Sequence, residues 1–183
     1  HIQGFNGLTD ELIKCLDDER IPLIEDVCES HGATHNDRRV GSFGLMSNFS
    51  FYYAHHMSTI EGGMVCTNDE EIYETLRMLR SHGMVRESSN EAKAAYFHQN
   101  HPDLNPQFIF AHAAYNMRNN EIGAILGRQQ LKNLDKNNII RSRNQNHFLS
   151  TINGEVFQTD FFVKGSSNYA FNLVLKEKDD RLM

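Results

Sequence analysis

The chain has 183 residues, 39% of them hydrophobic and 23% charged, a composition typical of a globular domain with a sizeable core. Its formal net charge is −6 and it contains no basic run, which argues against nucleic acid as a partner. Its apolar stretches are too short to cross a bilayer, so we expect no membrane-spanning segment.

The cysteines and the two ends of the chain carry further expectations. Cys15, Cys28 and Cys66 are an odd number without paired spacing, which fits free thiols in a reducing cytoplasm better than a disulfide framework. No charged-then-apolar leader follows His1, so we expect no secretory signal. The chain has no initiator methionine and stops after a strand-like run. We therefore expect both ends to be cut from something longer.

The first third of the chain alternates a helix with short strands. Thr9, followed by two acidic residues, predicts a helix start. Apolar runs predict a buried strand at residues 22–24 and further strands at residues 49–52 and 64–67, the last two paired around a Gly-Gly turn.

The remaining two thirds are predicted to be mainly helical. Asn68 is expected to cap a helix that ends at Gly83, and residues 86–107 are polar and irregular, which predicts a long loop. An amphipathic helix is predicted at residues 122–134, with Ile122, Ile125, Leu126 and Leu131 facing inward. A second helix is expected at 138–152 and a strand at 169–175. Alternating strands and helices indicate an α/β architecture.

Several polar residues are candidates for chemistry. Glu25 and Asp26 follow an apolar strand, and ligands of open α/β sheets gather at the carboxyl ends of strands, although such a carboxylate is also a common helix cap. Ser50 stands near a Gly-Gly turn, where its hydroxyl can bind a phosphate. The histidines and Cys28 could ligate a metal, but their spacing matches no known zinc pattern, so we expect no metal site.

Four segments, in order, resemble the motifs of one family across roughly residues 20 to 135. Residues 25–33 are similar to Glu-Asp-Ala-Ala-Gln-x-x-Gly-Ala. Residues 50–68 are similar to Ser-Phe-x-x-x-Lys, then Gly-Glu-Gly-Gly-Met-Val and Thr-Asn. Residues 76–83 resemble the helix that follows, and residues 115–131 are similar to the segment Gly-Tyr-Asn-x-Arg and Glu-Ile-x-Ala…Gln-Leu. The chain thus resembles the sugar aminotransferase and dehydratase family, of the DegT/DnrJ/EryC1/StrS type.

The resemblance implies a fold, a cofactor and a set of roles. The fold is the large domain of fold-type I enzymes, which use pyridoxal or pyridoxamine phosphate. Residues 1–135 would form part of this cofactor-binding domain, and residues 136–183 a helix and the start of a small domain. Asp26 would pair with the pyridine nitrogen, Ser50 would bind the cofactor phosphate, and Asn116 would reach the phosphate of the other subunit in a homodimer.

Glu29 stands where many members of the family have glutamine, near the cofactor ring. An acid at this position could relay a proton as a catalytic group and contact the cofactor. It could equally be a solvated side chain.

His55 departs from the aminotransferase pattern, because it stands where that pattern has the lysine that holds the cofactor covalently. Imidazole has no primary amine, and the chain has no lysine between Lys14 and Lys93. The site is therefore either inactive or uses His55 as a base without a covalent anchor. Histidine suits proton transfer near neutral pH, and the 3-dehydratases of the family carry this replacement, so the second interpretation is favoured.

Two types of 3-dehydratase compete for the match. One uses an iron–sulfur cluster, which usually requires four cysteines, and the chain has three. The other acts without a cluster on GDP-4-keto-6-deoxymannose in colitose synthesis, with L-glutamate as amino donor, and it is the better fit. His55 would take a proton from the cofactor while the 3-hydroxyl of the sugar leaves. A non-catalytic homologue, an enzyme for another nucleotide sugar, and a metal hydrolase are the alternatives.

Overall fold

The computed structural model describes residues 1–177, which fall into two compact units. The first unit combines residues 1–65 with residues 121–183, and the second holds residues 66–120. The predicted domain boundary at residue 135 concerns the whole protein and stays a prediction. Each unit is described separately below.

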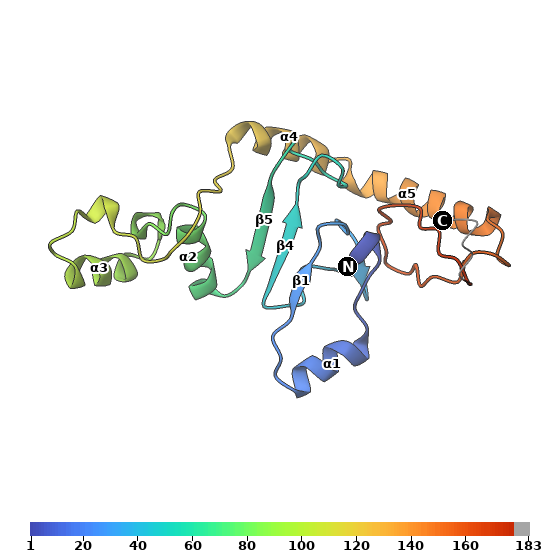
Figure 1. Ribbon diagram of the computed structural model, residues 1–183, viewed down its shortest axis with the longest axis horizontal. Coiled ribbons are helices and arrows are strands. Elements are labelled where there is room, and N and C mark those ends of the chain that lie inside the picture. Colours follow the sequence, from blue (N-terminus) through green and yellow to red (C-terminus); the bar gives the residue numbers. More distant parts are fainter. Residues whose placement is uncertain (178–183) are drawn as a thin grey trace. The chain divides into compact units, whose positions relative to one another are not determined.

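A three-stranded sheet organises the first unit (Figure 1). Its order is β1 (Ile24–Asp26), β4 (Met46–Ser50) and β5 (Gly63–Thr67), the last of which continues beyond residue 65. β1 and β4 run parallel, with Ile24 opposite Met46 and Asp26 opposite Asn48. Both strands therefore end at the same edge of the sheet, where their C-terminal polar residues meet. A small hairpin, β2 (Thr34–His35) with β3 (Arg38–Arg39), precedes β4.

The helices of the first unit are α1 (Asp10–Asp18), α4 (Glu121–Leu131) and α5 (Leu134–Thr151), with a short 3₁₀ helix at Ile2–Gly4. α1 begins as predicted, because the Thr9 hydroxyl accepts a hydrogen bond from the Leu12 N–H at 3.1 Å. The core of this unit is small: Leu8, Val27, Ala33 and Val40 are buried together.

The second unit contains α2 (Glu70–Leu79), α3 (Glu91–Asn100) and two 3₁₀ helices, Val85–Glu87 and Pro106–Phe108. Glu74, on α2, is only 3% exposed. Its carboxylate accepts hydrogen bonds from the hydroxyls of Ser88 and Ser89 and from the Ser89 N–H. These bonds, Ser88 first, lower the pKa of Glu74 to about 2. A buried charge thus fixes the turn between α2 and α3.

Two predictions for the second unit are wrong in part. The expected loop at residues 86–107 contains α3, because Asn90 caps an alanine-rich segment by accepting from the Lys93 N–H. α2 is capped by Asp69 rather than Asn68, and it ends at Leu79. Gly83 lies beyond that end with φ +75°, in a turn where a Cβ atom would meet the His112 carbonyl oxygen.

Other boundaries in the first unit also differ from expectation. β1 lies two residues later than the predicted strand, and its Ile24 is 60% exposed while Glu25 is buried. Residues 169–175 form no strand and contribute only an isolated bridge from Leu175 to Phe157. The strand predicted at residues 49–52 is β4, which lies earlier, at Met46–Ser50. β5 and α1 are confirmed. The helix predicted at 138–152 is confirmed as α5, which starts earlier, at Leu134. All three cysteines are free, as predicted.

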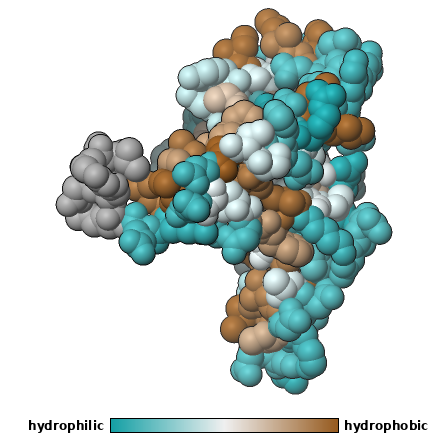
Figure 2. Space-filling model, turned by 90° about the vertical axis from the view of Figure 1, so that its right-hand side faces the viewer, coloured by the Kyte–Doolittle hydropathy of each residue, from teal (hydrophilic) through white to brown (hydrophobic). Residues whose placement is uncertain are grey.

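The apolar face predicted for residues 122–134 is present but is not buried within the chain. Ile122, Ile125 and Leu131 on α4 are 58–70% exposed, and Leu126 is 37% exposed. Helical periodicity determines which side chains share a face, but not whether a neighbour covers that face. Figure 2 shows hydrophobic side chains at the surface of the molecule. No helix among residues 1–177 is long and apolar enough to span a membrane.

Candidate active site

The edge where β1 and β4 end brings two of the predicted site residues together. Asp26 is the last residue of β1 and Ser50 the last of β4. Asn48, opposite Asp26 in the parallel pair, donates its side-chain amide to Asp26 Oδ1 at 3.1 Å. The Cys28 N–H donates to the same oxygen at 3.0 Å. The Cys28 thiol is a further hydrogen-bond partner of this carboxylate.

Asp26 is ionised at neutral pH. Burial acts to raise its pKa, but the hydrogen bonds from Cys28 and Asn48 outweigh burial, so the pKa lies below its ordinary value. Beside it, burial and then the Asp26 carboxylate raise the pKa of the Cys28 thiol to about 11. Cys28 is therefore a neutral thiol here, and Asp26 supplies the negative charge at this edge.

Ser50 and His55 are joined by a short turn. The Ser50 hydroxyl accepts a hydrogen bond from the Tyr52 N–H at 3.3 Å, and the His55 N–H donates to the Tyr52 carbonyl at 3.1 Å. Both side chains are half-buried. The turn thus connects the backbone of His55 to the end of the strand at which Ser50 lies.

His55 sits among aromatic rings. Its ring centroid is 5.8 Å from that of Tyr52, 5.5 Å from that of Tyr169 and 6.2 Å from that of His31. Its Nδ1 is buried and has no hydrogen-bond partner within residues 1–177. A buried polar nitrogen without a partner costs free energy, so its position calls for an explanation beyond packing.

His31 is the least expected member of this group, because the sequence suggested it only as a possible metal ligand. It is 2% exposed, and its ring lies 5.8 Å from both Phe49 and Phe51 and 5.6 Å from His56. Neither ring nitrogen makes a hydrogen bond to a described residue by distance and angle. Burial, followed by repulsion from His56 and His55, lowers the pKa of His31 to about 4, so the ring is neutral at physiological pH.

His56 is anchored through the backbone. Its Nε2 lies 3.0 Å from the carbonyl oxygen of Ser167, which can only accept, so Nε2 carries the proton. Its Nδ1 is buried without a partner among the described residues. Burial lowers the pKa of His56, which keeps this ring neutral as well.

The carbonyl that anchors His56 belongs to a firmly held segment. The Ser167 N–H donates to the Gly4 carbonyl at 2.9 Å, and the Tyr169 N–H donates to the Gln3 carbonyl at 3.1 Å. Gly4 has φ +87°, and a Cβ there would clash with the backbone of residues 168 and 169, so glycine allows this close approach. Arg141 on α5 donates to the carbonyls of Asn168 and Tyr169.

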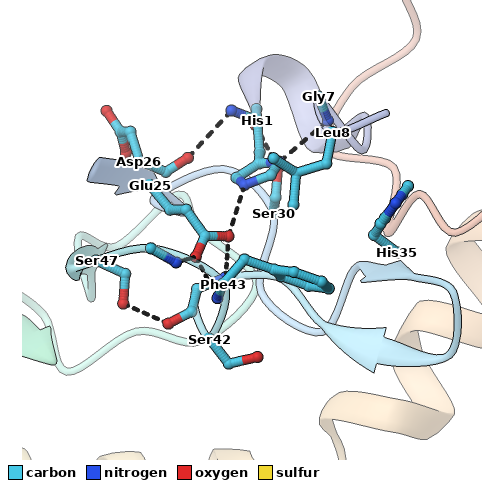
Figure 3. Close-up of polar contacts among 12 residues, drawn as sticks. His1, Gly7, Leu8, Glu25, Asp26, Ser30, His35, Ser42, Phe43 and Ser47 are labelled. Carbon is cyan, nitrogen blue, oxygen red and sulfur yellow. Dashed lines mark hydrogen bonds and ion pairs between the residues drawn. The ribbon is translucent and has the colours of Figure 1, made fainter. Parts of the chain in front are cut away.

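Glu25 has a structural role. It is 2% exposed and points to the opposite side of β1 from Asp26 (Figure 3), as successive strand residues do. Its carboxylate accepts from the N–H groups of Gly41, Phe43 and Gly44 at 2.6–2.8 Å. It therefore organises the loop before β4 and is not available to a ligand.

Two other predicted residues make contacts of their own. Glu29 is half-buried, and its carboxylate accepts from the Gln3 N–H at 2.6 Å, which gives it a structural contact and does not test a role in proton relay. Asn116 belongs to the second unit, where it is exposed, bridges to Ser81 and accepts a hydrogen bond from Arg118.

Metal ligation finds no geometric support in the described residues. No group of three or more His, Cys, Asp or Glu side chains among residues 1–177 is arranged to hold a metal ion. A separate small pocket lies beside α5 and is lined by residues that include Gln3, Gly4, Ser142 and Gln145. None of the predicted site residues lines it.

Comparison with known proteins identifies relatives across nearly the whole chain. The model of the DegT/DnrJ/EryC1/StrS aminotransferase family matches residues 1–180. The GDP-4-keto-6-deoxy-D-mannose 3-dehydratase of Escherichia coli O55:H7 is 35% identical over 169 residues, which cover 92% of this chain and 43% of that protein. The chain therefore spans less than half the length of this relative.

Solved structures agree with the sequence match. The chain superposes with a TM-score of 0.81 and 31% identity on the E. coli GDP-4-keto-6-deoxy-D-mannose 3-dehydratase with bound hydrated PLP, covering 97% of this chain and 46% of that one. A second structure of such a dehydratase, with a trapped PLP–glutamate geminal diamine, gives a TM-score of 0.79 and 28% identity, with coverage of 97% and 46%. The α/β, fold-type I class predicted from the sequence is confirmed by these neighbours.

Proposed function

Since the chain belongs to the DegT/DnrJ/EryC1/StrS aminotransferase family, we propose that the protein is a 3-dehydratase that removes the 3-hydroxyl of a nucleotide-linked 4-keto-6-deoxyhexose. The substrate we propose is GDP-4-keto-6-deoxymannose, because the relatives that cover most of the chain are named for it. The amino donor would be L-glutamate and the pathway colitose synthesis in the cytoplasm.

The observation that carries this proposal is a histidine, His55, in the turn that follows Ser50, with Asp26 and Ser50 at one edge of the sheet. The chain offers no lysine between Lys14 and Lys93, so no primary amine from this segment can replace it. A half-buried histidine ring can take up and release a proton near neutral pH. This distinguishes a proton-transfer site from an aminotransferase site with a covalently anchored cofactor.

The residues at the edge fit pyridoxal or pyridoxamine phosphate. Asp26 presents an ionised carboxylate at the end of β1, as an ion pair with a protonated pyridine nitrogen requires. Ser50 presents a half-buried hydroxyl at the end of β4. When bound, pyridoxamine phosphate supplies an amino group that can condense with the 4-keto carbon and a ring that accepts electrons.

Each residue then has a defined task. Asp26 keeps the pyridine nitrogen protonated, and Ser50 donates to the phosphate. His55 removes the proton whose loss drives departure of the 3-hydroxyl. Glu29, three residues after Asp26, is proposed to contact the cofactor and to relay a proton once its hydrogen bond to Gln3 is exchanged for one to the ligand.

We also propose a homodimer in which Asn116 binds the cofactor phosphate of the other subunit. The exposed apolar face of α4, with Ile122, Ile125 and Leu131, supports an interface close in sequence to Asn116. In the full-length protein, Asn116→Ala should weaken cofactor retention. A full-length protein that is monomeric and fully active would contradict this proposal.

The function is tested by turnover of the full-length protein with GDP-4-keto-6-deoxymannose, pyridoxamine phosphate and glutamate. We expect a 3-deoxy-4-keto sugar and release of ammonia. Transfer of an amino group to the sugar would instead indicate an aminotransferase, and absence of any conversion would favour a non-catalytic homologue. Asp26→Asn keeps a side chain of the same shape but loses the charge, so it should reduce turnover by about 100-fold or more while the protein stays folded.

A further inference from the structure

The proposed base His55 and two histidines near it, His31 and His56, share one unusual feature. Four of their ring nitrogens are buried without a hydrogen-bond partner among the described residues: both nitrogens of His31, Nδ1 of His55 and Nδ1 of His56. Native proteins leave few such atoms, because each costs about 1–3 kcal/mol. The nitrogens without partners belong to neighbouring rings, which suggests that these rings hydrogen-bond to one another.

His31 contacts both of the other histidines. Its ring centroid lies 5.6 Å from that of His56 and 6.2 Å from that of His55. At these separations, facing ring edges are within reach of a hydrogen bond after a small ring rotation or through one bridging water. Phe49 and Phe51 pack against the same ring, and the other polar groups beside His31 and His56 are backbone carbonyls of Ser50, Ser167 and Asn168.

The direction of a chain of hydrogen bonds through the three rings is set at His56, the ring that is bound to the Ser167 carbonyl. Because the Ser167 carbonyl can only accept, His56 carries its proton on Nε2 and presents Nδ1 as an acceptor. His31, which is neutral, has one N–H to donate to that acceptor and one nitrogen left to accept. When His31 donates to His56 rather than to the nearby Ser50 carbonyl, the group of His55 that can satisfy the remaining nitrogen of His31 is an Nδ1–H.

We propose that His56 and His31 are positioning residues that hold His55 in the tautomer with its proton on Nδ1 and a free lone pair on Nε2. Protons balance along the chain: His55 Nδ1–H donates to His31, His31 donates to His56 Nδ1, and His56 Nε2–H donates to Ser167. Each ring carries one proton in this arrangement. When His55 Nε2 takes up the substrate proton, His31 accepts a hydrogen bond from the imidazolium and stabilises it.

The catalytic use of this tautomer rests on the proposed function. The tautomer itself can be measured without turnover. In the full-length protein labelled with ¹⁵N-histidine, the nitrogen chemical shifts of each ring distinguish protonated from unprotonated positions. The wild type should show His55 with Nδ1–H and unprotonated Nε2. A wild-type His55 with its proton on Nε2 would overturn the proposal, whatever the variants do.

Variants test whether the other two rings cause this state. His31→Phe and His56→Phe each remove a link and should convert the His55 signals to a mixture of tautomers. His31→Gln keeps an acceptor and a donor and should restore the Nδ1–H form. Phe51→Leu, which alters packing against the same ring without removing a polar atom, is the matched control and should leave the tautomer unchanged. A His55 Nδ1–H signal that persists in both phenylalanine variants would overturn the proposal.

Kinetics supply a second readout. His31→Phe should lower kcat by about 10- to 100-fold, the range found when outer-shell partners of a functional histidine are removed, with little change in KM for the nucleotide sugar. Unchanged kcat in this variant would also contradict the proposal. If His55→Asn retained full turnover, the role of His55 as the base would fail. The nitrogen shifts would still decide whether the hydrogen-bond chain through the three histidines exists.

Discussion

Glu25 and His31 are both about 98% buried in the same unit, yet their surroundings differ. Three backbone N–H groups satisfy the Glu25 carboxylate and hold the loop before β4 in place. Both ring nitrogens of His31, by contrast, lack a hydrogen-bond partner among residues 1–177, although two other imidazoles lie beside it. A buried polar group with all its hydrogen bonds made stabilises a fold. A cluster of buried polar groups without hydrogen-bond partners is typical of a functional site.

The largest effect is expected from His55→Asn, measured as kcat of the full-length protein. Asparagine is polar and of similar size but does not titrate near neutrality, and loss of a positioned general base typically costs about 10²- to 10⁴-fold. His147→Asn, on the exposed side of α5, is a matched control that should keep wild-type turnover. Retention of more than a tenth of kcat in His55→Asn would remove His55 from the reaction.

A loss of stability rather than of chemistry is expected at Glu25. In Glu25→Gln one carboxylate oxygen becomes an NH₂ group that faces backbone N–H donors, so the free energy of unfolding should fall by about 3–5 kcal/mol. Glu29→Gln, which disturbs one backbone hydrogen bond, should cost about 1 kcal/mol or less. Denaturant unfolding of both variants checks the contrast, and equal losses would refute the structural role given to Glu25.

The smallest effect is a change in how stability depends on pH. The pKa of His31 is lowered to about 4 by burial, whereas in the unfolded chain it is about 6.5. The unfolded state therefore binds more protons between these values, so the contribution of His31 is intact above pH 6.5 and is lost as the pH falls towards 4.

His31→Phe should flatten the pH dependence of unfolding in this window, by at most about 3 kcal/mol between pH 6.5 and pH 4. Subtracting the variant curve from the wild-type curve removes the contribution of the other histidines. Parallel curves would mean that His31 has the same pKa in the folded and the unfolded protein, which would contradict its lowered pKa.

Sequence patterns predicted local structure better than they predicted which side chains are buried. The cap at Thr9 and the strand at residues 63–67 follow from short-range rules and are present. The inward face assigned to Ile122 and Ile125 is wrong for the described chain, because exposure depends on neighbours that periodicity does not reveal. The helix at Glu91–Asn100 was missed because the polar residues around it obscured the capping signal of Asn90.

The site was predicted only in part for a related reason. Asp26, Ser50 and His55 are close in sequence to strand ends, and parallel pairing brings two of them to one edge. Apart from the nearby Tyr52, the rings against His55 belong to His31 and Tyr169. The carbonyl that orients His56 belongs to Ser167. Long-range contacts of this kind leave no periodic signal. The sequence therefore indicates His31 only as a possible metal ligand and does not predict that it lies beside the base.

The central claim, that His55 acts as a base in place of a covalent anchor, is tested most directly by borohydride reduction of the full-length protein loaded with pyridoxal phosphate. Peptide mapping by mass spectrometry should find no cofactor adduct on any lysine of the wild type, and the cofactor should be released on denaturation. In His55→Lys a primary amine occupies this position, and the adduct should map to residue 55 while dehydration is lost. An adduct on any lysine of the wild type would contradict the account and indicate an aminotransferase with a displaced lysine.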